Sequence, residues 1–178
     1  MEYINKNPKI YIISGKAKSG KDKLADMIID RYKNKKCIKL SYSYYLKQYV
    51  KKITGWNGLE ETKPRTLLQE FGIKFLKNKI DDKLLIKRLI TDINVYSYFY
   101  DVIVITDARL KEEIEIPKKE FNNVITIRIK GEHNNLSIEE KKHITEINLD
   151  NYNDFDYIFD YKKIEEEFKS LEREFYEK

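Results

Sequence analysis

The stretch that decides the fold is KIYIISGKAKSGKD, residues 9–22. It begins as an apolar run rich in β-branched residues and ends in a basic loop bounded by Gly15 and Gly20. Glycines at these two positions allow the backbone to curl, so that successive N–H groups point inward at an anion. A helical pattern follows, and the N-terminus of a helix adds partial positive charge at the same place. The stretch therefore predicts a strand, a phosphate-binding loop and a helix.

The loop matches the Walker A spacing G-x-x-x-x-G-K through Lys21. Lys21 would reach the β- and γ-phosphates of a nucleotide as a point charge. The position that usually offers a Ser or Thr hydroxyl to Mg²⁺ is Asp22, and Lys23 follows it. The alternative is an ordinary strand-turn-helix connection with two glycines, and the flanking strand and helix favour phosphate binding over it. The expected ATP-binding residues are Gly15, Lys16, Ala17, Lys18, Ser19, Gly20, Lys21 and Asp22.

Composition indicates one intracellular domain. The 178 residues suffice for one sizeable core, so we expect a single domain over residues 1–178. The net charge of +5, from 35 basic and 30 acidic residues, is modest and does not argue for a nucleic-acid partner. Cys37 is the only cysteine, which excludes an internal disulfide and a cysteine metal cluster. No apolar stretch approaches membrane-spanning length and the N-terminus lacks a signal peptide, so we expect a cytoplasmic protein with no membrane partner.

Apolar runs alternate with amphipathic helical patterns along much of the chain. The first strand, helix and second strand form a β-α-β unit, which requires parallel strands. We expect strands at residues 9–13, 37–40, 102–106, 124–129 and 157–159. We expect helices at residues 22–33, 110–119 and 162–176. The sequence thus predicts an α/β fold in three layers with a five-stranded parallel sheet.

Residues 42–96 interrupt this alternation with helical patterns only, at residues 45–53, 64–76 and 82–95. Pro64 suits the first turn of the second of these helices, and Asp81 or Asp82 can cap the third. A helical insert between the second and third strands is where a nucleotide-handling fold could hold its second substrate.

Residues 130–154, between the last two predicted strands, are polar and charged and contain both histidines. This composition predicts a lid rather than part of the core. His143 and Glu146 are three residues apart, so on a helix they share a face. They could place His143 near a phosphate, form a capping or surface pair, or bind a metal, although no other histidine or cysteine cluster supports a metal. Lys141 and Lys142 would serve in the lid or face solvent.

Ligands collect at the carboxyl ends of parallel strands, where the loop, Ser41, Arg109 and Arg128 should converge. Asp107 ends an apolar strand there, as a carboxylate that holds Mg²⁺ does. Capping of the helix that begins near Leu110 is an equally good interpretation of Asp107. Arg109 could contact a phosphate or pair with Asp107.

The insert carries polar side chains among its apolar helical positions, namely Lys63, Arg65, Gln69 and Lys77. Arg65 suits a monophosphate, because its guanidinium can bind two oxygens at once. Gln69, one turn further on, can contact a base edge or a sugar. The alternative is a solvated basic helix face.

Taken in order, these segments resemble the P-loop deoxynucleoside monophosphate kinases of phages and low-GC bacteria, which are related in fold to adenylate kinase and dephospho-CoA kinase. The resemblance covers most of the chain, through residues 14–22, 46–47, 65–69 with Gly72, 107–109 with Glu113, 141–146, 149–150 and 155–157. Asp22 fits this family, which tends to carry Asp after the loop lysine. Two positions depart from the family pattern: Lys23 replaces a Thr, and Lys77 replaces an Arg.

The resemblance implies a P-loop NTPase fold and transfer of the γ-phosphoryl group of ATP to a deoxynucleoside 5′-monophosphate, with Mg²⁺ as cofactor. It implies catalytic roles for Lys21, Arg109 and Arg128, and Mg²⁺ binding by Asp22 and Asp107. It implies acceptor binding by Ser41, Lys47, Arg65, Gln69 and Lys77, and lid roles for Lys142, His143 and Glu146. The alternatives are a P-loop kinase of another small metabolite, such as dephospho-CoA, and a non-catalytic nucleotide-binding module. A homodimer is left open.

Overall fold

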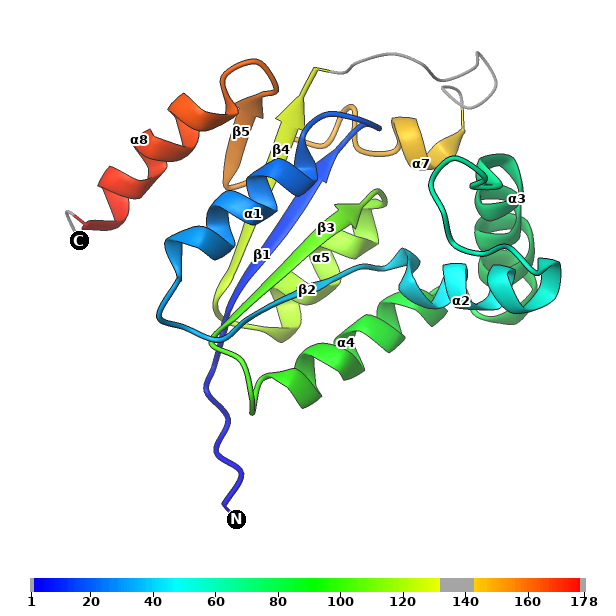
Figure 1. The fold of residues 1–178 in the computed structure, drawn as a ribbon, viewed down its shortest axis with the longest axis horizontal. Helices are drawn as coiled ribbons and strands as arrows, with labels where there is room; N and C mark the ends of the chain where they lie inside the picture. The colour runs from blue at the N-terminus through cyan, green and yellow to red at the C-terminus, as the bar shows by residue number, and fades with distance from the viewer. Residues whose placement is uncertain (1, 132–142, 177–178) are drawn as a thin grey trace.

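A five-stranded sheet forms the centre of the molecule, and all of its strands run parallel (Figure 1). The computed structural model describes residues 2–131 and 143–176. In the spatial order β2-β3-β1-β4-β5, the strands are Cys37–Leu40, Val102–Ala108, Lys9–Gly15, Val124–Lys130 and Tyr157–Asp160. The predicted parallel α/β sheet is confirmed, and every strand but β2 continues one or two residues beyond its predicted end.

Helices cover both faces of the sheet and give the molecule its predicted three layers. Tyr11 and Ile13 of β1 pack with α1 and α8, whereas Ile10 and Ile12 pack with α4 and α5. Successive residues of a strand face opposite sides, so β1 contributes to both cores. The helical elements are α1 (Lys21–Arg31), α2 (Ser43–Thr54), α3 (Arg65–Glu70), η1 (Phe71–Ile80), α4 (Leu84–Tyr96), α5 (Lys111–Glu120), α7 (Ile144–Ile147) and α8 (Ile164–Tyr176).

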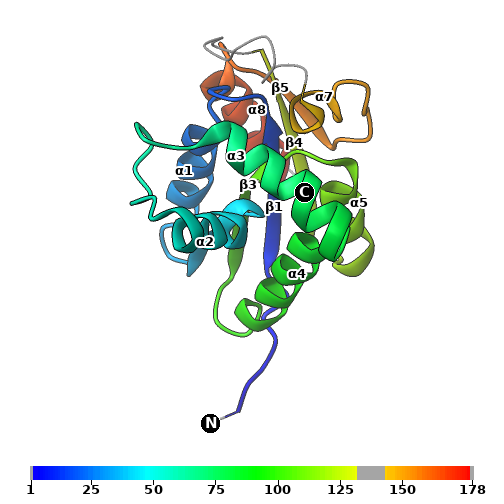
Figure 2. The ribbon, with the colours of Figure 1, turned by 90° about the vertical axis from the view of Figure 1, so that its right-hand side faces the viewer.

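The insert has a small core of its own, formed by Leu46, Val50, Leu68 and Leu76 from α2, α3 and η1. When the right-hand side of Figure 1 faces the viewer, α3 crosses in front of the sheet (Figure 2). α4 belongs to both parts, because it also packs on the sheet. The helices of the insert therefore stand against the carboxyl ends of the strands while remaining connected to the main core.

Two details of the insert differ from prediction. The helix expected over residues 64–76 is α-helical only to Glu70 and continues as a π-helix to Ile80. The N-cap of α4 is Lys83 rather than Asp81 or Asp82, and it receives no side-chain cap. Oδ1 of Asp81 instead accepts the N–H of Lys83 at 2.9 Å, in a turn that precedes the helix.

The segment predicted as a lid is only partly described. Lys141 and Lys142 lie outside the described residues, so the lid prediction for Lys142 stays a prediction. From His143 onward the chain forms α7, and Leu149 is buried in the core that also holds α4 and α5. Leu149 therefore anchors the end of this segment to the main core, and the lid expectation for residues 130–154 stays a prediction.

Among the described residues, no helix is both long and apolar enough to span a bilayer.

Candidate functional site

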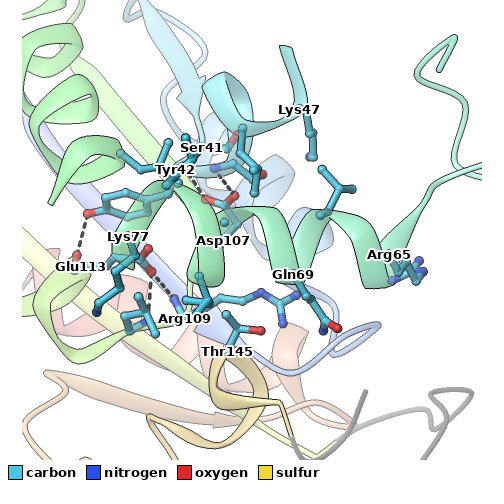
Figure 3. Close-up of a pocket in the computed structure, with 18 of the residues that line it drawn as sticks. Ser41, Tyr42, Lys47, Arg65, Gln69, Lys77, Asp107, Arg109, Glu113 and Thr145 are labelled. Atoms are coloured by element: carbon cyan, nitrogen blue, oxygen red, sulfur yellow. Dashed lines mark hydrogen bonds between the residues drawn. The ribbon is translucent and has the colours of Figure 1, made fainter. Parts of the chain in front are cut away.

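A cavity of about 680 Å³ lies between the loop after β1, the helical insert and α7. Side chains from all three parts line it, together with residues at the carboxyl end of β3 (Figure 3). This is the edge of the sheet at which parallel α/β proteins bind ligands. The cavity therefore brings together most of the residues that the sequence placed at this edge.

The loop of residues 15–22, called here the phosphate loop, has the backbone that its glycines predict. Gly20 has φ 89° at the N-cap of α1, a left-handed conformation that favours glycine. A Cβ on Gly15 would overlap Ser19 Oγ and would lie 3.2 Å from the carbonyl oxygen of Ile129. Ser19 is buried, and its Oγ has no partner among the described residues. The loop is thus tightly curled, with a buried hydroxyl available for a hydrogen bond.

Lys21 folds back over this loop. Its Nζ donates to the carbonyl oxygens of Gly15 at 2.9 Å and Lys16 at 2.6 Å. Burial, and then the charge of Arg109, lower the pKa of Lys21 to about 8. The ammonium group is therefore held at the cavity wall by the loop itself. An anionic ligand bound there would raise the pKa of Lys21 and so favour its charged form.

Lys23, which departs from the pattern of the family that the sequence resembles, does not line the cavity. Its Nζ forms an ion pair with Glu165 of α8 at 2.5 Å. More than half of both side chains is exposed, so this pair contributes little to stability. The position after Asp22 therefore belongs to the contact between α1 and α8 and not to the cavity.

Asp107 holds the start of α2. Its two carboxylate oxygens accept the N–H groups of Tyr42 at 2.8 Å and Ser43 at 3.0 Å. The register between β1 and β3 shifts between Ile12 and Ser14, where β3 has one residue more than β1. Such a bulge redirects the side chains beside it. The carboxylate thus fixes the insert to the centre of the sheet.

The interpretation in which Asp107 caps the helix that begins near Leu110 is therefore wrong. Glu113 performs that function, because its Oε2 accepts the N–H groups of Arg109 at 2.6 Å and Leu110 at 2.9 Å. Glu113 is buried, and burial, followed by the charge of Asp107, raises its pKa to about 7 against the opposing effect of these hydrogen bonds.

The carboxylates of Asp22 and Asp107 both line the cavity and suit Mg²⁺. This cation is usually bound through one or two carboxylates while substrate phosphates and water complete its shell. Each carboxylate oxygen can accept more than one bond, so the two N–H groups on Asp107 do not exhaust it. The residues present fit the cofactor that the sequence predicts.

Arg109 extends into the cavity toward Gln69 and Thr145 (Figure 3). Its guanidinium pairs with Glu146 of α7 and not, as one interpretation had it, with Asp107. Asp107 is already engaged with the backbone of α2, whereas α7 brings Glu146 to the open side of Arg109. Arg109 therefore joins β3 to α7 across the cavity wall.

The insert lines the cavity with Lys47, Lys63, Arg65 and Lys77. Lys63 and Arg65 both pair with Glu60, at 2.9 Å in the case of Lys63. Burial lowers the pKa of Lys47. Lys77 lies 3.7 Å from Glu112 of α5. Cationic side chains of the insert thus line the cavity at several points, and each has carboxylates nearby.

No family model and no curated protein matches the chain. Among solved structures, shikimate kinase from Bacteroides thetaiotaomicron is similar, with a TM-score of 0.51 over 92% of this chain and 96% of that one. The chain therefore shares its α/β fold with that kinase. At 12% sequence identity the likeness concerns the fold alone.

Within this fold, most predicted site residues meet at the cavity described above. Those that line it are Ala17, Lys18, Lys21, Asp22, Ser41, Lys47, Arg65, Gln69, Lys77, Asp107, Arg109 and Glu146. Gly15, Lys16, Ser19 and Gly20 of the phosphate loop are not among these residues, and neither is Arg128. Arg128 is buried, donates to Ser14 Oγ at 2.8 Å and pairs with Asp150 at 3.1 Å. Its guanidinium thus joins β1, β4 and the segment after α7, and its predicted catalytic role stays a prediction.

His143 does not line the cavity either and caps α7. Its Nδ1 accepts the N–H of Thr145 at 3.3 Å and lies 2.9 Å from Thr145 Oγ1. The capping interpretation is confirmed. No group of three or more potential metal ligands occurs among residues 2–131 and 143–176.

Sequence reasoning missed several cavity residues. Glu60 lies in a polar loop without a motif, and its role depends on contacts that only the folded insert creates. Thr145 was hidden within the segment expected to be a lid. An aliphatic wall of the cavity is formed by Leu46, Leu68, Ile73, Leu76, Leu84 and Leu85. In the sequence these residues follow a helical periodicity, which predicts burial but does not indicate a ligand.

Proposed function

We propose that this protein transfers the γ-phosphoryl group of ATP to a deoxynucleoside 5′-monophosphate, yielding the diphosphate and ADP. The observation that carries this proposal is a cavity lined both by residues of the phosphate loop and by cations of the insert. A donor and an acceptor that both carry phosphate need cationic groups for each of them within one cavity.

For the donor, the loop N–H groups and Lys21 bind the phosphates of ATP. Asp22 and Asp107 hold Mg²⁺, which neutralises charge on the phosphates when it is bound. Arg109, which also lines the cavity, offsets the charge that develops on the transferred group. The reaction needs no strong general base, because an acceptor phosphate is already nucleophilic. Alignment and charge neutralisation then account for catalysis.

For the acceptor, Arg65 and Lys47 bind the monophosphate, and Lys77 lines the same cavity twelve residues further along the insert. Gln69 of α3 offers a donor and an acceptor to the sugar or base. The aliphatic wall formed by α2, α3, η1 and α4 provides apolar contact for a flat base. Polar and apolar surface are thus arranged as a nucleotide requires.

A coupled assay of ADP release with each common nucleoside and deoxynucleoside monophosphate tests the proposal. We expect turnover with at least one deoxynucleotide and little ATP hydrolysis without an acceptor. Shikimate and dephospho-CoA belong in the same panel, because turnover with either would replace the nucleotide with another small metabolite. Acceptor-independent hydrolysis, or none at all, would contradict a kinase activity.

Lys21→Ala tests the binding of the donor. We expect transfer to fall by about 10²-fold or more, because a preorganised charge at the phosphates is lost. The folded structure should persist, as judged by circular dichroism and Tm. Lys23→Ala is the matched control, since Lys23 points to α8 and its removal should leave turnover unchanged. Wild-type turnover by Lys21→Ala would exclude this role for the loop.

A further inference from the structure

We propose that Glu146 is a positioning residue that fixes the guanidinium of Arg109 in the cavity. The catalytic consequence rests on the proposed function, in which Arg109 contacts phosphate. The structural part, that Glu146 restrains Arg109, stands on the contacts described here and can be tested without any substrate.

The two side chains differ sharply in exposure. The side chain of Glu146 is 6% exposed and that of Arg109 27% exposed. Glu146 Oε1 accepts from Nη1 of Arg109, and both residues line the cavity. The carboxylate is thus a buried anchor, and the guanidinium that it holds is open to a ligand.

Stability does not explain the carboxylate. Oε2 of Glu146 is buried and has no hydrogen-bond partner among the described residues. A buried polar atom without a partner destabilises a fold, and an apolar side chain at such a site is often at least as stable. This cost is offset by what Glu146 does for the neighbouring cations, and Arg109 is the one that it contacts.

The anchor stands on a rigid base. His143 caps α7, Leu149 is buried just beyond it, and Asn148 Oδ1 accepts the N–H of Lys111 at 2.7 Å. These contacts fix α7 both to the main core and to the start of α5. A group held by well-fixed neighbours positions its partner better than one on a mobile loop.

Arg109 is consequently held at two points. Glu113 accepts its backbone N–H at 2.6 Å, and Glu146 holds its guanidinium. Lys21 and Arg128 also lie within electrostatic range of Glu146, so its charge offsets the repulsion among three cations. An arginine fixed in this way loses little conformational entropy when phosphate binds. Most of the entropy cost of ordering its side chain arises during folding and does not add to the barrier of the reaction.

The test is Glu146→Gln in the full chain, with Tm, kcat and KM measured together. Gln keeps the size and one acceptor oxygen but removes the charge. We expect kcat to fall by about 100-fold, as for a misplaced catalytic group, while KM for ATP and Tm change little. In an Arg109→Lys background the same substitution should add almost nothing, because the two residues act as a unit. Glu115→Gln, which removes a partly exposed partner of Lys111 on α5, is the matched control.

A second readout needs no activity. The chain has six arginines, so the ¹⁵N signals of its guanidinium groups can be assigned, with Arg109→Lys identifying that of Arg109. We expect restrained rotation of the Arg109 guanidinium in the wild type and free rotation in Glu146→Gln. If Glu146→Gln fails to fold, Glu146→Asp retains the charge and should give a smaller loss of restraint and of kcat.

The outcomes are distinct. If the wild type transfers no phosphoryl group, but Glu146→Gln loses the restraint on Arg109 that the wild type shows, the proposed function is contradicted and the positioning role is supported. Unchanged restraint in Glu146→Gln, unchanged kcat, or tighter ATP binding with higher kcat would overturn the positioning role. The last result would mean that Glu146 competes with phosphate for Arg109.

Discussion

Glu60 lies where the cations of the insert converge, and its contacts predict competition with a bound anion. Lys63 and Arg65 pair with its carboxylate. Although burial acts to raise it, the pKa of Glu60 is lowered by Lys63, Arg65 and Lys47. A phosphate at the same cations must displace this carboxylate or share its partners.

Glu60→Gln should therefore lower KM for the acceptor. We expect about a twofold to fivefold effect, because exposed ion pairs of this kind contribute at most about 1 kcal/mol. The measurement is KM at saturating ATP, with kcat unchanged. Glu61→Gln removes the same charge from the neighbouring exposed position and is the control. Equal effects of the two substitutions would show that net charge, and not the pairing of Glu60, is responsible.

Lys21 gives a second prediction for a single residue. Burial and the charge of Arg109 lower its pKa to about 8 in the free protein, so its ammonium form is lost as the pH rises through 8. kcat/KM for ATP, which reports on free enzyme, should fall about tenfold per pH unit above that value. Lys21→Arg keeps its charge and should flatten this limb of the profile. An unchanged limb in Lys21→Arg would assign it to another group.

Among the elements, the contact between α1 and α8 depends on a glycine. Gly20 has φ 89°, and a Cβ there would lie 2.6 Å from Cδ1 of Ile164. Gly55 has φ 73°, and a Cβ added there would have no atom within 4 Å. Gly55→Ala therefore serves as a control for backbone strain alone. Both alanine variants should lose about 1 kcal/mol of unfolding free energy from the left-handed backbone.

Gly20→Ala should lose about 1–3 kcal/mol more than Gly55→Ala, because Ile164 has to move. Urea denaturation of both variants provides the comparison. Equal losses would mean that α8 adjusts freely and that α1 and α8 are loosely packed at this end.

Most elements could be predicted from the sequence because their patterns are local. The buried run that begins at Val102 predicts β3, and the glycine spacing predicts the phosphate loop. The π-helix from Phe71 to Ile80 could not be predicted, because hydrophobic periodicity locates a helix without fixing its hydrogen bonds. The role of Asp107 was hidden for another reason: its partners, Tyr42 and Ser43, lie 65 and 64 residues away in the sequence.

At the scale of the whole molecule, three acidic side chains connect the site to the rest of the fold. Asp107 holds the start of α2, Glu113 holds the start of α5, and Glu146 brings α7 to Arg109. Glu113 and Glu146 are largely buried. Burying a carboxylate is unfavourable unless it is well paired, so the fold accepts a cost at the same edge where it gathers cations.

This cost should appear as a pH dependence of global stability. Glu113 has its pKa raised from 4.5 to about 7, chiefly by burial. Between these values the folded state binds more protons than the unfolded state, so the free energy of unfolding falls as the pH rises from 4.5 toward 7. The total change from this group is about 3 kcal/mol at most, at 1.36 kcal/mol per pKa unit.

Glu113→Gln replaces the carboxylate with a neutral side chain of the same size and should remove this dependence. Urea denaturation at pH 5 and pH 8 measures it: the wild type should lose up to about 3 kcal/mol more than the variant over this interval. Glu115→Gln, on the same helix but only partly buried, should behave like the wild type. An equal pH dependence in wild type and Glu113→Gln would mean that Glu113 stays ionised at pH 5, and that its two backbone N–H bonds outweigh its burial.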